Sequence, residues 1–256
     1  MKDTLYTIPL TDAFKSGDEC PFCFIYRKLE QDAISFTLGA SYMEDDIRAQ
    51  TDDLGFCSSH YKKLYDYGNR LGLAFILQTH YVALQKTLKN SLKSTSPAAP
   101  TLLQKLRKGP KIQSTKGNTL ATQSLYNKID SCYVCNRVNY NFNRYIKTFF
   151  YLITTNEDFK TLFEESKGLC LPHFTQLLDE APYHLKEKDT TIFLEESQKK
   201  LLESLKRIEE DLSWFIDKYD YRNNDAPWKN AKDAIPRGIQ KLSSIYVQDP
   251  PFKESK

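Results

Sequence analysis

The chain of 256 residues has little glycine, 9 residues, and only 11 prolines. Because tight turns between strands rely on these two residue types, their scarcity argues against a domain built from many short strands. No apolar run approaches the roughly 18–20 residues that a membrane helix needs. The first residues, MKDTLYTIPL, lack the apolar core of a signal peptide. We therefore expect a cytoplasmic protein that makes no contact with a membrane.

Sequence motifs of the common enzyme classes are also missing. The chain has no Walker loop, no G-x-G-x-x-G, no G-x-S-x-G and no H-E-x-x-H. His80 and His184 fall outside the Cys/His pattern of the chain and are typical of ordinary helix or loop residues. These absences favour a binding or regulatory protein. An enzyme with a cleft between two halves stays open as an alternative, with Tyr26, Arg27, His80 and Arg144 as candidate cleft residues.

Acidic residues are absent from residues 67–129, a stretch that holds ten Lys and Arg residues. Within it, Ser94–Gln123 is rich in Ser, Thr, Pro and Lys, which predicts a flexible basic linker. A basic linker can contact nucleic acid or another polyanion. No recognition helix or RNA-binding signature accompanies it, so a solvated connector is the simpler interpretation. We expect a protein partner, with polyanion binding through the linker as the alternative.

The cysteines follow one pattern that occurs twice. The chain reads C-x2-C-x33-C-x2-H and then C-x2-C-x34-C-x2-H, so that none of its 6 cysteines is left over. Two ligands three residues apart can chelate one ion from a tight turn or a first helical turn, and three thiolates with one imidazole form a tetrahedral zinc set. The pattern predicts two zinc ions, held by Cys20, Cys23, Cys57, His60, Cys132, Cys135, Cys170 and His173.

Other uses of the cysteines explain the pattern less well. Disulfides belong to exported proteins and do not require a histidine at a fixed offset. A thioredoxin-like redox pair lacks its βαβ context here, and an iron–sulfur cluster with one histidine is uncommon. Each predicted zinc site already has four protein ligands, which leaves no open position for water or substrate. The sites are therefore expected to be structural.

The repeated pattern indicates an internal duplication, with sparse further matches such as the glycine two residues before Cys57 and Cys170. The predicted domains are a first zinc-binding repeat at 1–93, the basic linker at 94–123, and a second zinc-binding repeat with C-terminal helices at 124–256. Each zinc would pin the start of one helix to the start of another. The fold class is all-α: two similar helical repeats, each with its own Cys3His site, joined by the linker.

Apolar spacings of three and four residues support this fold class. They predict a helix after Cys23, a long helix that starts near Cys57, a helix from Pro172 that Pro182 ends, and a last helix over residues 187–219. An acidic segment, 44–53, precedes the second of these. The last helix is expected to bury a stripe at Leu194, Leu201, Leu205, Ile208, Leu212, Phe215 and Tyr219.

Two pairings of the ligands are possible. Pairing within each repeat places Cys20 and Cys23 with Cys57 and His60, and it is favoured because a single ancestral module must have closed its own site. The alternative is an exchange, in which Cys20 and Cys23 join the C-x-x-H of the second repeat. The linker is long enough to permit this.

Taken together, LYTIPLTDAF, ECPFC, GFCSSHYKKL, CYVC with GLCLPHF, and KYDYRNNDAPWKNAKDAIPRGIQKL resemble a domain-of-unknown-function family of uncharacterised bacterial proteins, found mainly in anaerobic Gram-positive bacteria. The resemblance covers nearly the whole chain except the linker. It implies an intracellular helical protein and no particular activity. Our hypothesis is a zinc-stabilised adaptor or regulatory protein; the alternatives are the enzyme above and a thiol-based redox or zinc sensor.

Overall fold

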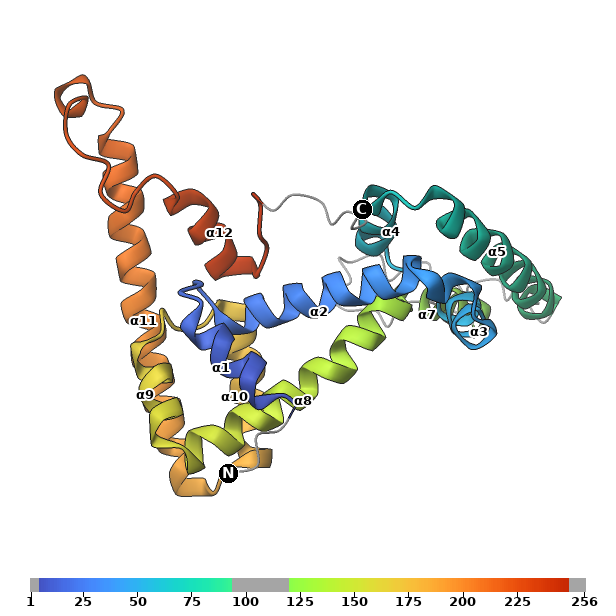
Figure 1. Ribbon diagram of the computed structural model, residues 1–256, viewed down its shortest axis with the longest axis horizontal. Helices are drawn as coiled ribbons and strands as arrows, with labels where there is room; N and C mark the ends of the chain where they lie inside the picture. The colour runs from blue at the N-terminus through green and yellow to red at the C-terminus, as the bar shows by residue number, and fades with distance from the viewer. Residues whose placement is uncertain (1–4, 94–119, 249–256) are drawn as a thin grey trace, which may run out of the picture. The chain divides into compact units, whose positions relative to one another are not determined.

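The computed structural model describes residues 5–93 and 120–248, and every regular element in these ranges is a helix (Figure 1). The all-α prediction is confirmed, since the described residues contain no strand. Among the helices described, none combines the length and the apolar character that a membrane span requires.

The chain divides into two compact units, and each draws on both halves of the sequence. Unit 1 comprises Met1–Glu30 and Val138–Pro250, and unit 2 comprises Gln31–Arg137 and Pro251–Lys256. Two long helices, α2 (Pro21–Leu38) and α8 (Tyr133–Thr155), each begin in one unit and end in the other. The division into repeats at 93 and 124 stays a prediction. Most of the expected linker lies outside the described residues, and its last four residues begin α7 (Leu120–Asp130).

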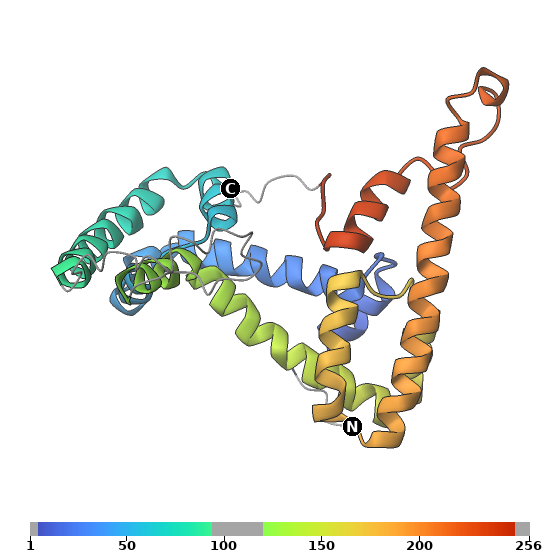
Figure 2. The same cartoon turned by 180° about the vertical axis from the view of Figure 1, so that it is seen from behind.

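Unit 1 is built around its longest helix, α11 (Glu187–Asp217). Figures 1 and 2 both show α12 (Ala234–Ser243) beside α11, and the C-terminal end of α11 projecting past the other helices of the unit. Its further elements are α1 (Thr7–Lys15), α9 (Glu157–Glu165), α10 (Leu171–His184) and η2 (Tyr221–Asn223).

The core of unit 1 is a cluster of phenylalanine rings. Phe149 of α8 is completely buried, and its ring centroid lies 5.2–6.1 Å from six other rings. Most of these pairs meet edge to face, the geometry that aromatic quadrupoles favour. The rings come from the start of α2, from α8 itself and from the helices around it: Phe14, Phe22, Phe150, Phe159, Phe163 and Phe193. The cluster therefore joins segments from both ends of the sequence.

Unit 2 contains η1 (Ala40–Met43), α3 (Asp45–Leu54), α4 (Ser58–Tyr67), α5 (Arg70–Lys93) and α7, with α3 packed against α5. The acidic segment at 44–53 is thus mostly helical. The long helix expected from Cys57 is interrupted at Gly68, which separates α4 from α5. This residue has φ +111°, which glycine adopts without the steric penalty of a side chain.

Two further helix predictions need correction. Pro182 does not end α10, which continues to His184. A proline in the last turn removes only one backbone hydrogen bond, and the amide of Leu185 still donates to Ala181 O at 2.9 Å. The buried face of α11 is also different from the predicted stripe, since Leu194 is 36% exposed and Tyr219 is 77% exposed. The residues that face the unit interior are Phe193, Ser197, Leu201, Ser204 and Ile208.

Candidate metal centres

All four C-x-x-C and C-x-x-H pairs have the same local geometry. In each, the first cysteine directly precedes a helix, and the second ligand lies in the first turn of that helix. The four helices are α2, α4, α8 and α10. In each case the backbone carbonyl of the first cysteine accepts the first intrahelical hydrogen bond, at 2.8–3.2 Å, from Phe24, Tyr61, Asn136 or Phe174. The prediction that the ligands lie at helix starts is confirmed, and the positive end of each helix dipole favours a thiolate there.

The first cluster consists of Cys20, Cys23, Cys170 and His173, and all four residues are buried. Nδ1 of His173 lies 3.5 Å from Cys20 Sγ, 3.4 Å from Cys23 Sγ and 3.1 Å from Cys170 Sγ. The sulfurs of Cys23 and Cys170 are 3.4 Å apart. The start of α2 therefore meets the start of α10 in unit 1.

The second cluster consists of Cys57, His60, Cys132 and Cys135. Nδ1 of His60 lies 3.2 Å from the sulfurs of Cys57 and Cys132 and 3.3 Å from that of Cys135. The sulfurs of Cys57 and Cys135 are 3.9 Å apart. Here the start of α4 meets the start of α8, and both lie in unit 2.

These distances match the edges of a tetrahedron around a metal ion. With zinc–sulfur bonds of about 2.3 Å and zinc–nitrogen bonds of about 2.0 Å, two sulfurs are about 3.8 Å apart and a sulfur and a nitrogen about 3.5 Å apart. All six cysteines are free thiols. The sulfurs of Cys23 and Cys170, at 3.4 Å, are well beyond the length of about 2.05 Å of a disulfide bond. The donor set and its geometry fit a four-coordinate metal ion in each cluster.

The hypothesis that each repeat closes its own site is wrong. Each cluster combines the C-x-x-C of one half with the C-x-x-H of the other. The reason lies in α2 and α8, which have 18 and 23 residues and are therefore about 27 and 35 Å long. Each rigid helix begins at a C-x-x-C and carries the chain away from it before the next C-x-x-H is reached. In this fold the two ligand pairs of one repeat therefore do not meet.

Hydrogen bonds among the cluster residues shift the pKa values of their thiols in opposite directions. Burial raises the pKa of the Cys20 thiol, but hydrogen bonds from Cys170, Cys23 and His173 outweigh it and hold this pKa well below its usual range. Hydrogen bonds to Cys170 and Cys20 raise the pKa of Cys23 far above its ordinary value. In the second cluster, the hydrogen bond from Cys135 lowers the pKa of Cys132 to about 3, despite burial. Metal binding would therefore displace protons from the remaining thiols.

The two clusters differ in exposure. In the first, the ring of His173 lies against the rings of Phe22, Tyr26 and Phe142, with centroids 5.3–6.3 Å apart. In the second, Cys57 and Cys135 are partly exposed. A solvent-accessible site is the feature that the sensor alternative requires.

Gly55 joins the two ligand pairs of the second cluster. It has φ +57°, and its carbonyl accepts a hydrogen bond from the amide of Tyr133, at 2.9 Å, directly after Cys132. A Cβ at this position would lie 2.8 Å from the ring of His80. Glycine is therefore required both by the backbone conformation and by the neighbouring ring.

We expect Gly55→Ala to weaken zinc binding at the second cluster by at least about tenfold, because strain and overlap together displace the loop before Cys57. Competition with a chromogenic chelator measures this affinity. Gly68→Ala is the matched control, since φ is +111° there but no atom lies within 4 Å of the added Cβ. An equal loss in both variants would show that contact with His80 has no effect on the site.

An ion-pair network centred on the buried Glu19 lies next to Cys20 of the first cluster, and it was not foreseen from the sequence. The Glu19 carboxylate is only 3% exposed and lies 2.5 Å from Arg207, 3.5 Å from Lys241, 3.6 Å from Arg237 and 3.8 Å from Lys167. Burial raises the pKa of Glu19, but the hydrogen bond from Arg207 and the nearby positive charges outweigh it, so that the pKa lies below its ordinary value.

The same network binds α12 to the two loops that precede Cys20 and Cys170. Lys241 is 1% exposed, and its Nζ donates to the backbone carbonyl of Glu19 at 2.6 Å and to that of Lys167 at 3.0 Å. Asp18 accepts hydrogen bonds from Gln240 at 2.6 Å and from the Tyr246 hydroxyl at 2.7 Å. The only signal for this in the sequence is the position of Asp18 and Glu19 directly before Cys20.

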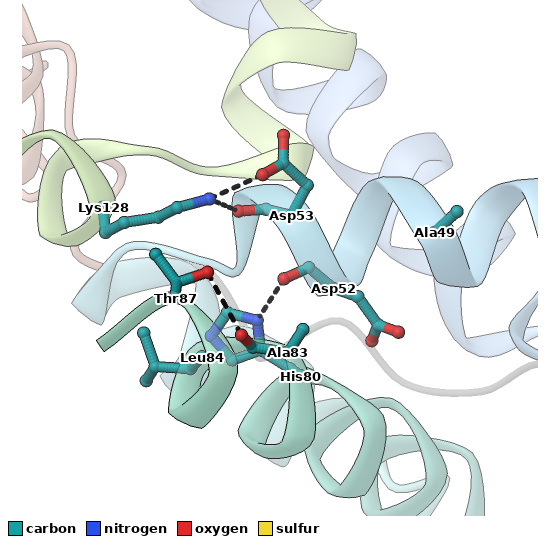
Figure 3. A pocket seen from close by; sticks show the side chains of 8 residues that line it. All are labelled: Ala49, Asp52, Asp53, His80, Ala83, Leu84, Thr87 and Lys128. Atoms are coloured by element: carbon teal, nitrogen blue, oxygen red, sulfur yellow. Dashed lines mark hydrogen bonds and ion pairs between the residues drawn. The ribbon is translucent and has the colours of Figure 1, made fainter. Parts of the chain in front are cut away.

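A pocket lies in unit 2 between α3, α5 and α7 (Figure 3). The carbonyl of Asp52 accepts from Nδ1 of His80 at 2.9 Å, and the Asp52 carboxylate accepts from Thr79 at 2.6 Å. Lys128 is bound to the Asp53 carboxylate at 2.6 Å. Asp52, Asp53, His80 and Lys128 are thus all engaged in hydrogen bonds or an ion pair.

The four candidate cleft residues are not gathered at this pocket, because only His80 lines it. Tyr26 packs on Phe142 and His173 in unit 1. The guanidinium groups of Arg27 and Arg144 lie over tyrosine rings, and Arg144 also donates to the Tyr6 hydroxyl at 2.7 Å. The enzyme alternative stays a hypothesis.

The fold and the clusters define an all-helical protein with two Cys3His groups that could hold metal ions. The chain belongs to a family of unknown function, DUF6062, whose match covers residues 1–249. It is also similar to an uncharacterised 23.9 kDa protein from the xynA 3′ region of Caldicellulosiruptor sp. (strain Rt8B.4), with 23% identity over 206 residues, which are 80% of this chain and 85% of that protein. No solved structure matches the chain.

Proposed function

We propose that this protein holds two structural zinc ions and uses the helical scaffold they stabilise to bind a protein partner. Three thiolates and one imidazole select zinc among the common intracellular metals, and four protein ligands leave no position for a reacting water. The free thiols and the tetrahedral distances in both clusters support zinc. A closed site stabilises a fold and carries no reaction, so the activity is expected elsewhere on the surface.

The observation that carries the binding role is the orientation of α12, which buries two polar residues together with Ala234 and leaves its larger apolar side chains partly exposed. Gln240 and Lys241 are 6% and 1% exposed, whereas Ile235, Ile239 and Leu242 are 45%, 36% and 62% exposed. Helices of globular proteins ordinarily do the reverse. We call the three exposed residues the apolar stripe.

The spacing of the apolar stripe indicates the kind of partner. Its residues lie at positions i, i+4 and i+7, which places them on one side of the helix. A stripe of this kind packs against the apolar face of a second amphipathic helix. Ile245 and Val247, which are 56% and 49% exposed, follow the stripe in the sequence. We propose that an amphipathic helix of another protein docks on α12.

The double variant Ile239→Lys and Leu242→Lys tests this role. We expect it to keep both zinc ions and its helix content, because both side chains point to solvent. Its affinity for the partner should fall by at least about 30-fold, as expected when central apolar contacts of an interface are replaced by charge. The partner is identified by affinity capture from the native cells, and its dissociation constant is then measured with purified proteins by calorimetry.

Leu202→Lys is the matched control, since Leu202 is an equally exposed leucine, at 58%, on α11. It should bind the partner as the unmodified chain does. Equal binding by the double variant would contradict the proposal. A chain that self-associates in analytical ultracentrifugation, and loses this association in the double variant, would show instead that the apolar stripe joins two copies.

A further inference from the structure

We propose that the metal ion of the first cluster controls how firmly α12 is packed on unit 1. Lys241 is the residue that couples metal binding to the packing of this helix. This inference rests on the proposed function, because it concerns how the apolar stripe is presented. It assigns to the first cluster a role beyond stabilising the core of unit 1.

The first step of the argument is what holds α12 in place. Its larger apolar side chains are partly exposed, whereas Ala234 is fully buried and Gly238 lies close to Ile208 and Leu212 of α11. Apolar contacts therefore account for part of the packing of α12 on α11. Polar contacts also hold the helix, from Lys241 and Gln240 to the ligand loops and from Arg237 to Asp211 on α11, at 3.0 Å.

The second step of the argument concerns which loops Lys241 contacts. Its ammonium group donates to the carbonyl of Glu19, next to Cys20, and to the carbonyl of Lys167, three residues before Cys170. These two loops are distant in sequence and belong to the two halves of the first cluster. A metal ion bound by Cys20 and Cys170 fixes the separation of the loops, and Lys241 requires both carbonyls at hydrogen-bonding distance at once.

It follows that metal binding and the docking of α12 stabilise each other. Without the ion the two loops are free to separate, and a buried ammonium group that loses an acceptor is strongly destabilised. α12 then loosens, and the apolar stripe is no longer held in its orientation. Because coupling between two sites is reciprocal, loss of the Lys241 contacts must weaken metal binding at the first cluster by the same factor.

Hydrogen exchange of the full zinc-loaded chain tests the first direction. In Cys170→Ala, which removes a ligand of the first cluster, the protection of amides 234–243 should fall by at least about tenfold. In the matched variant Cys135→Ala, which removes a ligand of the second cluster, their protection should stay unchanged. Equal protection of α12 in the two variants would overturn the inference.

Lys241→Met tests the reverse direction and does not remove a ligand. With a chromogenic chelator as competitor, one of two zinc equivalents should bind at least tenfold more weakly than in the unmodified chain. Lys218→Met is the control, since Lys218 is also a buried lysine that donates to backbone carbonyls, at 2.5–2.8 Å, but those belong to residues 223–226. If Cys170→Ala unfolds unit 1, the zinc affinity of Lys241→Met is the deciding measurement. A zinc affinity unchanged within twofold would overturn the inference.

Neither measurement requires the partner, so the two proposals can fail separately. Normal partner binding by the Ile239→Lys and Leu242→Lys variant would refute the proposed function and leave the coupling intact. The coupling alone would be refuted if that variant lost partner binding while Cys170→Ala left the hydrogen exchange of α12 unchanged and Lys241→Met left the zinc affinity unchanged.

Discussion

Cys23→Ser and Cys170→Ser should remove the same zinc ion. The unmodified chain is expected to carry two zinc ions, and each of these single variants one. The double variant Cys23→Ser with Cys170→Ser should still carry one, because both residues belong to the first cluster. Cys23→Ser with Cys57→Ser should carry none, although both residues lie in the first half of the chain. A serine hydroxyl is a poor substitute for a thiolate ligand, so each loss should be nearly complete.

Mass spectrometry of metal content after gel filtration, with protein determined by amino-acid analysis, gives these stoichiometries. His184→Ala is the control, since His184 stacks on Phe150 outside both clusters, and this variant should keep two ions. Pairing within each repeat predicts the opposite pattern: one ion in the Cys23/Cys57 variant and none in the Cys23/Cys170 variant. Strong visible absorption in the purified chain would indicate iron–sulfur clusters and would refute zinc as the resident metal.

Phe149→Ala should destabilise unit 1 by about 3–5 kcal/mol, the range found for removal of a fully buried aromatic ring. Phe149 is 0% exposed and contacts six other rings, so the cavity cannot close without moving several helices. Urea unfolding of the zinc-loaded chain, followed by tryptophan fluorescence, measures this loss. Both tryptophans, Trp214 and Trp228, lie in unit 1, so the signal reports on that unit.

Tyr151→Ala is the matched control, because Tyr151 is an aromatic residue on the same helix but is 55% exposed. We expect it to change the free energy of unfolding by no more than about 0.5 kcal/mol. A loss of less than about 1 kcal/mol for Phe149→Ala would mean that the phenylalanine cluster is not the main source of stability in unit 1.

Much of the local structure could be predicted from the sequence because its causes are local. The spacing of three between paired ligands matches the start of a helix, where one residue precedes the first turn and the other lies within it. The prediction for the last helix shows the limit of such reasoning. Its stripe was assigned from apolar residues alone, whereas the buried face includes Ser197 and Ser204 and leaves Tyr219 exposed. Burial depends on which neighbours surround a helix, and periodicity does not identify them.

The all-α class, the eight residues of the two Cys3His clusters and their positions at helix starts follow from local sequence patterns. Which of the ligands meet depends on the tertiary fold. The two pairings contain the same residue types at the same local spacings, and they differ in the direction in which α2 and α8 carry the chain between one ligand pair and the next. The same is true of α12. Its sequence has one apolar and one polar side. The polar side is buried because the folded chain brings Asp18 to Gln240, and the carbonyls of Glu19 and Lys167 to Lys241.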